Sequence, residues 1–366
     1  MSFAVNTFQL NSYAGLVRNH HEDAIPAAGY AERNLTAGPS AGEGVINLLT
    51  SSHEQVRSDV VAAMQRLAEV LGSCASALDA SVKMYDSTDR GSAEQLDSTY
   101  PNPGDPPKLP PLPGGIDQGG TISVVWQARF PAGRLTEPGK PVDFQNPIQI
   151  INDLTNLLSP GWWIAQILKE TIGVNPVEEL AKVITGDWEA IAKCASTFNS
   201  LSFFCEDVAY DLRINLGALL ETWHGNAANG AFQYFGAFGA TIESHQQALG
   251  GLRDKYLEAA RGVWEMAETA GDLIQGIFDW AFWAAVEVAA GGVLVETGVG
   301  PAVLWSLAAL QCAAIVRDWK AVTDLIMKVQ NLVRGIHGEI LNLIGSNGAF
   351  KAHPFPADGY HNPGVR

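Results

Sequence analysis

The chain has 366 residues, of which 47% are hydrophobic, and a formal net charge of -16. This length allows two or three domains with sizeable cores, and the hydrophobic content argues against global disorder. The negative charge disfavours binding to nucleic acid, whose phosphates require clustered Lys and Arg, and it disfavours simple adsorption to anionic lipid. Because residues 1–6 have neither a basic segment nor an apolar core, we expect no conventional signal peptide.

The first hundred residues read as a helical hairpin. Residues 10–33 have an irregular helical pattern in which Pro26 predicts a kink or break. Ser40 and Glu43 form a capping box that begins the next helix. Apolar residues at near-helical spacing then define one stripe, made of Val56, Val60, Leu67, Leu71, Cys74, Leu78, Val82 and Tyr85. This stripe requires a partner surface to pack against.

Tyr85 and Asp89 form the first short motif, Tyr-x-x-x-Asp, at the end of this stripe. Residues four apart on a helix project from the same face. We therefore expect the two side chains to form one surface that a partner protein reads.

A proline-rich segment separates this hairpin from the rest of the chain. Residues 101–113 hold seven prolines, so we expect extended polyproline II and a linker over residues 101–143. A stiff spacer is the favoured interpretation over a peptide ligand at residues 107–110, although that stretch fits the P-x-x-P pattern. Residues 121–130 are β-branched and aromatic, and they predict a short extended segment.

The second helical region opens at Pro147 and continues through Trp162 and Trp163. Asn175 and Pro176 predict a helix start, with Asn as the cap and Pro at the first helical position. Residues 186–187 predict an interruption, after which Asp187 caps a longer helix that runs to residue 222.

Trp223-His224-Gly225 is the second motif and predicts a helix reversal, since glycine can adopt the positive φ that ends a helix. The following residues 226–272 are rich in Ala and Gly at first, which suits a tight antiparallel hairpin. Residues 43–89 and 175–223 are nearly equal in length, at roughly 70 Å each if fully helical. Two such helices that start level end level, and this would bring the two motifs together.

Residues 274–316 form an apolar block with two alternative interpretations. Its charge-free runs are shorter than the ~20 residues of a spanning helix, so a hydrophobic hairpin packed on the bundle or in a homo-oligomer is favoured. The alternative is a segment that enters a membrane after export, with Glu287 and Glu296 losing their charge on acidification or burial. Residues 317–344 return to an amphipathic pattern, and we expect a mobile tail over residues 346–366.

The reactive residue types show no catalytic pattern. The four cysteines are Cys74, Cys194, Cys205 and Cys312. They lack metal-site spacing and are interpreted as small buried residues. A disulfide from Cys74 to a cysteine of the second region is the weaker alternative. His20 and His21, with the acids that follow them, are interpreted as a solvated helix face. We expect no catalytic residues, no cofactor and no metal, and hence no enzyme.

The two motifs carry a resemblance to substrates of actinobacterial type VII (ESX) secretion systems. Residues 1–100, ending in Tyr85-x-x-x-Asp89, are similar to EspC-like secretion-associated proteins. Residues 175–272, centred on Trp223-x-Gly225, are similar to the WxG helical-hairpin family. The resemblance implies that the two motifs lie side by side and form a bipartite export signal of Tyr85, Asp89, Trp223 and Gly225. The chain lacks the Pro-Glu and Pro-Pro-Glu openings of the paired secreted families, and it carries both halves of the signal itself.

We therefore expect an all-α, elongated bundle: a hairpin over residues 1–100, a linker over 101–143, a WxG hairpin over 144–272, an apolar subdomain over 273–345 and the tail. The resemblance implies a substrate or secreted component of a type VII system, located outside the cell or on its surface. Its implied partners are the secretion ATPase and a dedicated chaperone. A membrane-acting effector that uses residues 274–316 and a structural homo-oligomer stay open as alternatives.

Overall fold

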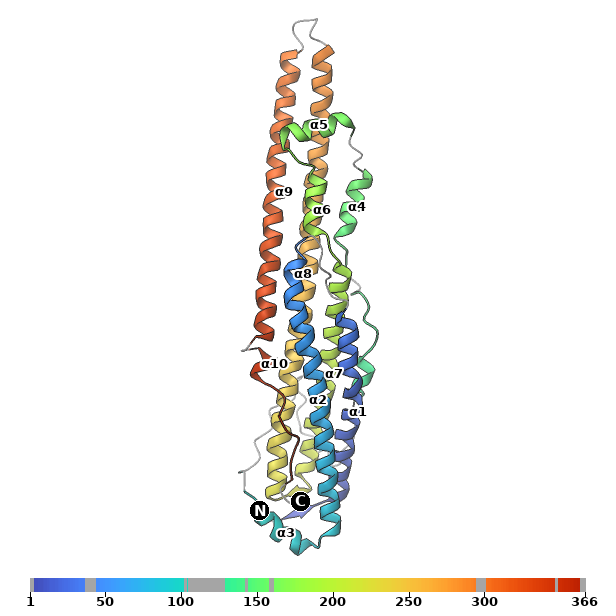
Figure 1. Cartoon of the computed structure of the whole chain (residues 1–366), viewed down its shortest axis with the longest axis vertical. Coiled ribbons are helices and arrows are strands. Elements are labelled where there is room, and N and C mark those ends of the chain that lie inside the picture. The colour runs from blue at the N-terminus through green and yellow to red at the C-terminus, as the bar shows by residue number, and fades with distance from the viewer. Residues whose placement is uncertain are drawn as a thin grey trace.

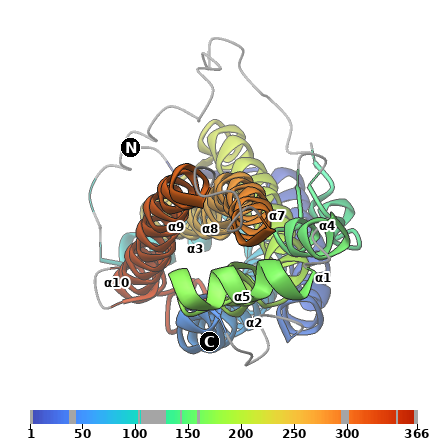
Figure 2. The same cartoon turned by 90° about the horizontal axis from the view of Figure 1, so that it is seen from above.

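The computed structural model describes residues 3–36, 44–101, 104, 129–141, 144–157, 161–293, 301–345 and 348–362. Within these residues the protein is an all-α bundle of long antiparallel helices, as expected, with a markedly elongated shape (Figure 1). Seen from above, the long helices pack around a common axis and one short helix lies across them (Figure 2).

Helices α1 (Thr7–Thr36) and α2 (Asn47–Ser87) form the first antiparallel pair. The apolar stripe predicted for α2 is buried along its whole length, from Val56 to Tyr85. Of the kink or break predicted at Pro26, the break is wrong, because α1 continues through this residue. Proline removes one backbone donor. The burial of Tyr30, Ala31 and Leu35 beyond it holds the last turns of α1 in place.

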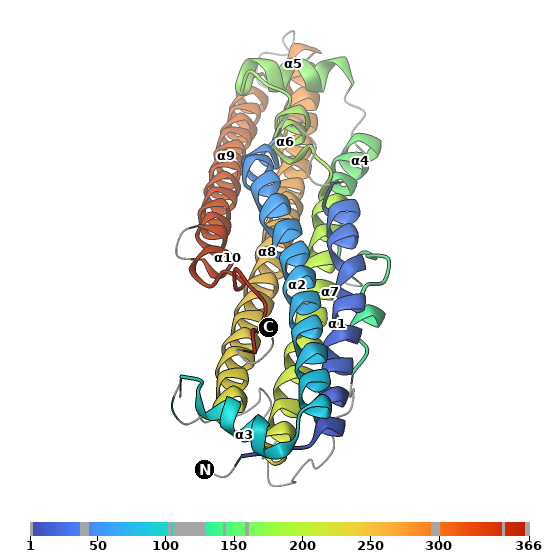
Figure 3. The same cartoon turned by 60° about the horizontal axis from the view of Figure 1, so that its bottom comes forward.

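The short helix α3 (Arg90–Ser98) follows α2 and lies at the lower end of the bundle (Figure 3). The predicted capping box at residues 40–43, residues 105–128 of the proline-rich linker and most of the extended segment at 121–130 lie outside the described residues. The 3-10 helix η1 (Pro131–Arg134) comes next. Arg129 and Arg134 both bind the buried carboxylate of Asp207, at 2.9 and 2.6 Å, and so attach this segment to the bundle.

Three short helices lead into the second long pair: α4 (Ile148–Leu157), α5 (Trp162–Thr171) and α6 (Pro176–Ile184). The predicted start of α6 is confirmed, since the Asn175 side chain accepts a hydrogen bond from the backbone N–H of Val177. The predicted interruption is also confirmed. Asp187 caps α7 (Trp188–Leu220) by accepting from the backbone N–H of Ala190 at 2.9 Å.

Helix α8 (Asn226–Val293) returns antiparallel to α7 and then pairs with α9 (Pro301–Ile344). It does not end near residue 272, where we expected the return helix to stop, and crosses that position without a break. Small side chains at its start, Ala227, Ala228 and Ala231, are buried as the tight hairpin requires. Helix α8 is also long and apolar enough between Asn226 and Ala290 to cross a membrane, judged by length and composition.

Helices α2 and α7 run in the same direction and are level at both ends. At the upper end the backbone N–H of Val45 donates to the carbonyl of Val183 at 2.9 Å. Gly186, with φ of 151°, lets Ile46 approach so closely that a β-carbon would collide with it. At the lower end the ring of Tyr85 contacts that of Trp223. The positions 45 to 85 and 183 to 223 therefore span equal lengths, as the sequence predicts.

Three of the four cysteines, Cys74, Cys194 and Cys205, are buried, and all four are free thiols. The interpretation as small buried side chains is confirmed for these three, and the alternative disulfide from Cys74 is wrong. Burial raises the pKa of both Cys194 and Cys205 to about 12, so these thiols stay protonated at physiological pH.

Residues 348–362 differ from the mobile tail expected from the sequence. After α10 (Ala349–Ala352) the chain runs along α2 and α8 towards the lower end (Figure 1). Phe355, Tyr360 and Asn362 are buried, and the carbonyl of Asp358 accepts a hydrogen bond from Tyr234 at 2.8 Å. These anchors are spaced too irregularly to register as a helix or strand pattern, which explains why the sequence suggests no structure here.

Candidate functional site

Tyr85 and Trp223, the aromatic residues of the two motifs, are in edge-to-face contact with ring centroids 6.3 Å apart. Tyr85 ends the buried stripe of α2, and Trp223 begins the two-residue strand β2 (Trp223–His224). Phe3 contacts Tyr85 on one side, and Phe232 of α8 contacts Trp223 on the other. The predicted adjacency of the two motifs is therefore confirmed, and it has the form of an aromatic cluster.

This cluster is buried rather than presented to solvent. Tyr85 is 7% exposed and Trp223 is 1% exposed. Burial raises the pKa of Tyr85 to about 12, so its phenol is neutral. The two rings therefore stabilise this end of the bundle from inside and form little of its surface.

The N-terminal strand covers the Trp223 turn. Strand β1 (Ala4–Val5) pairs antiparallel with β2, with Ala4 opposite His224 and Val5 opposite Trp223. The backbone N–H of Asn6 donates to the carbonyl of Thr222 at 3.0 Å. The start of the chain thus forms part of the structure around both motifs.

Gly225 has a φ of 132°, so the positive φ predicted for the reversal is confirmed. Asp97 of α3 faces this turn and is 7% exposed. Its carboxylate accepts hydrogen bonds from the backbone N–H groups of Asn226 at 2.7 Å and Ala227 at 2.9 Å, which are the first donors of α8. Asp97 therefore caps α8 from a different helix, in the manner of an N-cap residue.

No local sequence signal points to the role of Asp97. The groups it caps lie more than a hundred positions away along the chain, and its own neighbours form a short polar helix. The Asn226 side chain returns the contact by donating to the carbonyls of Asp97 and Tyr100, both at 3.2 Å.

Tyr85 and Asp89 do not share a helix face, so this part of the prediction is wrong. Helix α2 ends at Ser87, and Thr88 is extended with φ of -112° and ψ of 133°. Asp89 then caps α3 by accepting from the backbone N–H of Ser92 at 3.0 Å and from its hydroxyl at 2.6 Å. Aspartate is among the best N-cap residues, and this local interaction ends α2 before the motif is complete.

Asp89 is the one residue of the four that is fully exposed. The hydrogen bonds from Ser92 lower the pKa of its carboxyl, so it is charged at neutral pH. Asp86 is also exposed and lies in the last turn of α2. The carboxylates of Asp86 and Asp89 are therefore exposed where α2 gives way to α3.

The C-terminal segment completes this end of the bundle. The hydroxyl of Tyr360 donates to the carbonyl of Ala227 at 3.3 Å, in the first turn of α8. The side-chain amide of Asn362, which is 1% exposed, donates to Ser81 of α2 at 3.0 Å. We call the region formed by residues 3–6, 85–100, 223–227 and 360–362 the composite end, because it joins four separate segments.

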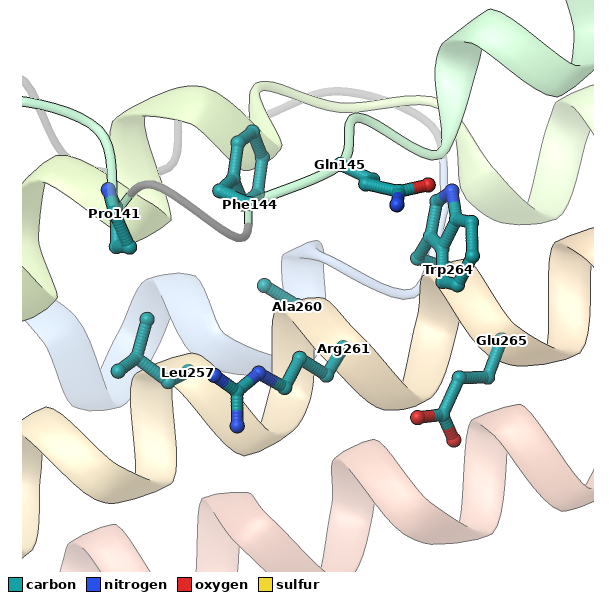
Figure 4. Close-up of a pocket in the computed structure, with 8 residues that line it drawn as sticks. All are labelled: Pro141, Phe144, Gln145, Leu257, Ala260, Arg261, Trp264 and Glu265. Carbon is teal, nitrogen blue, oxygen red and sulfur yellow. The ribbon is translucent and has the colours of Figure 1, made fainter.

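A small cavity lies elsewhere in the described structure, away from the two motifs. It lies between residues 141–145 and α8, where Trp264 reaches towards Gln145 (Figure 4). Its volume of about 150 Å³ is well below that of most ligand pockets. The lining residues are Pro141, Phe144, Gln145, Leu257, Ala260, Arg261, Trp264 and Glu265.

Within the described part of the chain, no three His, Cys, Asp or Glu side chains are grouped so that they could hold a metal ion. The comparisons with known proteins add no assignment: no family model matches the chain, and no curated protein or solved structure is significantly similar to it. The composite end is therefore the candidate site on the strength of its own geometry.

Proposed function

We propose that this protein is a substrate or secreted component of a type VII secretion system and that the composite end is its export signal. The observation that carries the proposal is the contact between the rings of Tyr85 and Trp223. Two motifs that resemble the halves of one signal lie in separate helical hairpins, and the fold joins them. Residues 1–100 and 144–272 supply the two hairpins, with residues 101–143 as the connection.

In this proposal the four signal residues have different roles. Tyr85 and Trp223 hold the ends of α2 and α7 together, and Gly225 allows the turn that Asp97 caps. Asp89 supplies an exposed negative charge to the secretion ATPase or to a chaperone that delivers the protein to it. The product would be located outside the cell or on its surface, without a cleaved signal peptide.

The role is non-enzymatic in this proposal, because the composite end consists of aromatic rings, a glycine turn and capping carboxylates. Such groups stabilise the fold of the composite end and expose a negative charge on it. The strong negative charge of the chain also argues against a nucleic-acid partner.

Substitution of Asp89 tests the proposal without disturbing the buried rings. Asp89→Asn keeps an oxygen that caps α3 but removes the charge, since Asn and Asp are comparable N-cap residues. We expect the protein to remain folded and soluble in the cytoplasm and to fall at least tenfold in the culture supernatant. Asp86→Asn is the matched control, because it removes the same charge from the neighbouring turn outside the motif.

The two variants give distinct outcomes. Equal export of Asp89→Asn and the wild-type protein would reject a charge-reading partner at Asp89. Equal loss in Asp86→Asn would show that net acidity, not the motif, is recognised. Circular dichroism on both purified variants establishes that the helices are intact.

A further inference from the structure

The apolar tip of the α8–α9 hairpin lies at the opposite end from the composite end. Both helices extend beyond the remaining long helices, and α5 crosses them below the tip (Figure 1). We define the apolar tip as residues 280–293 and 301–316. Within these two ranges the sequence has one charged residue, Glu287.

The side chains of the tip are unusually exposed for their type. Trp283 is 53% exposed and Leu310 is 68% exposed. The other exposed large apolar residues of the tip are Trp280, Phe282, Val286, Val288, Leu307 and Val316. Single exposed apolar residues are normal, but eight large ones near the end of one hairpin indicate an interaction surface.

The one charge of the tip is turned towards the partner helix. Gln311 of α9 donates to the Glu287 carboxylate at 3.0 Å, across the hairpin. The other carboxylate oxygen of Glu287 is buried. The exposed side chains of residues 280–288 and 307–316 therefore include large hydrocarbon and aromatic groups and no formal charge. Glu296 belongs to residues 294–300, which join the two ranges and lie outside the described residues.

The tip has a sharp polar boundary, and tryptophans lie at it. Charged residues resume at Asp279 on α8 and at Arg317 and Asp318 on α9. The indole N–H of Trp280 donates to Asp318 at 3.2 Å, so this side chain joins the apolar and polar zones. Tryptophan in this position is typical of the boundary between lipid hydrocarbon and water.

Helix α5 adds two more tryptophans near the same level. The hydroxyl oxygen of Thr171 lies 3.8 Å from the sulfur of Cys312, and Phe278 lines a cavity together with residues of α5. Trp162 and Trp163, at the start of α5, are 67% and 64% exposed and contact each other. The boundary of the tip is thus marked by aromatic side chains from two elements.

The length of the tip fits half a bilayer. Residues 280–293 of α8 extend roughly 20 Å at ~1.5 Å per residue. A bilayer is ~40–45 Å thick with its headgroup regions included, so a helix of this length that begins at the headgroup level reaches about the bilayer midplane. The rest of α8 is packed in the bundle core, as the burial of Tyr256, Val263 and Ile274 requires.

We propose that the apolar tip inserts into one leaflet of a zwitterionic lipid bilayer, with Trp280, Trp162 and Trp163 at the headgroup level. A net charge of -16 opposes approach to anionic lipid. The same charge opposes the close approach of a second copy, whereas a zwitterionic surface carries no net charge to repel the protein. The proposal concerns the end of the molecule that the export signal does not use.

Vesicle flotation with the purified full-length protein tests this insertion. We expect the wild-type protein to float with phosphatidylcholine vesicles and to lose at least tenfold in the partition coefficient when the vesicles contain mostly phosphatidylglycerol. Trp283→Asp and Leu310→Asp place a charge at exposed positions of the tip, where the fold does not depend on the side chain. Each should reduce flotation with phosphatidylcholine at least tenfold.

Phe8→Asp is the matched control, because Phe8 is 69% exposed near the opposite end of the bundle. It should float as the wild-type protein does. Absence of flotation by the wild-type protein, or equal loss in Phe8→Asp, would overturn the proposal. A dimer in light scattering that Leu310→Asp dissociates, without flotation, would assign the tip to self-association instead. None of these measurements depends on export, so they are independent of the proposed signal.

Discussion

The carboxylate of Asp97 occupies the space beside Gly225: a β-carbon at residue 225 would lie 2.5 Å from Asp97 Oδ2. The turn at Gly225, between α7 and α8, is therefore packed directly against the short helix α3, which follows α2. This relationship makes the composite end sensitive to small changes at both residues.

Gly225→Ala should destabilise the protein by about 1–3 kcal/mol, because alanine disfavours a φ of 132° and its methyl group would collide with Asp97. The measurement is urea unfolding followed by circular dichroism. Gly230→Ala is the control, since Gly230 lies in α8 with open space at its β-carbon. That substitution should be neutral or stabilising by up to about 1 kcal/mol, as for most helical glycines. Equal destabilisation by both would contradict a specific role for Gly225.

Asp97→Ala should cost about 1–3 kcal/mol of unfolding free energy, because it leaves the backbone N–H groups of Asn226 and Ala227 without their acceptor. Asp97→Asn should cost less, since one acceptor oxygen remains. Glu94→Ala, an exposed position on the same helix, should change stability by less than about 0.5 kcal/mol. The midpoints of denaturant unfolding compare the stabilities of the three variants. If Asp97→Ala is as stable as the wild-type protein, the cap at Asp97 is ruled out.

Acid should weaken the protein through His245. Burial lowers the pKa of this residue to about 4 from an ordinary value of 6.5, while its Nε2 lies 2.9 Å from the carbonyl of His353. The unfolded chain takes up the proton first as the pH falls. The free energy of unfolding therefore decreases by about 3 kcal/mol between pH 6.5 and pH 4 and changes little from this source above pH 6.5.

His245→Gln retains a donor for the His353 carbonyl but does not titrate. Thermal unfolding from pH 7.5 to pH 4.5 should show a smaller decrease for this variant than for the wild-type protein. Some decrease should remain, because burial also lowers the pKa of His53. Parallel pH profiles for the two proteins would exclude His245 as a source of the acid sensitivity.

Native thiol titration should distinguish one cysteine from the other three. Cys74, Cys194 and Cys205 are buried and burial raises the pKa of each, whereas Cys312 is partly exposed. We expect a disulfide reagent at pH 8 to modify Cys312 quickly and the others only after denaturation. In Cys312→Ser the fast reaction should disappear, and its persistence would show that another thiol is accessible.

The helices and their level ends could be predicted because the relevant signals are local. Asn175, Pro176 and Asp187 specify helix starts within a few residues, and the stripe that ends at Tyr85 has the period of a helix. Equal helix lengths then suffice to bring Tyr85 and Trp223 together. For Pro26 the local rule fails, since tertiary burial on both sides of the residue outweighs the lost hydrogen bond.

The composite end could be predicted only in part, because most of its contacts join distant segments. Spacing alone suggested that Tyr85 and Asp89 share a helix face, but the capping preference of Asp89 ends the helix between them. The contacts of Asp97, Tyr360 and Asn362 depend on the three-dimensional arrangement of elements that no short motif records.

The composite end takes residues from positions as far apart as Phe3 and Asn362. The ribosome has to synthesise and release nearly the whole stretch from residue 3 to residue 362 before the composite end can form. A machine that reads the finished shape would therefore ignore nascent and prematurely terminated chains, even though these already contain Tyr85 and Asp89. Under the proposed export function, selection of chains that include residues 360–362 would then follow from the fold alone, without a separate proofreading step.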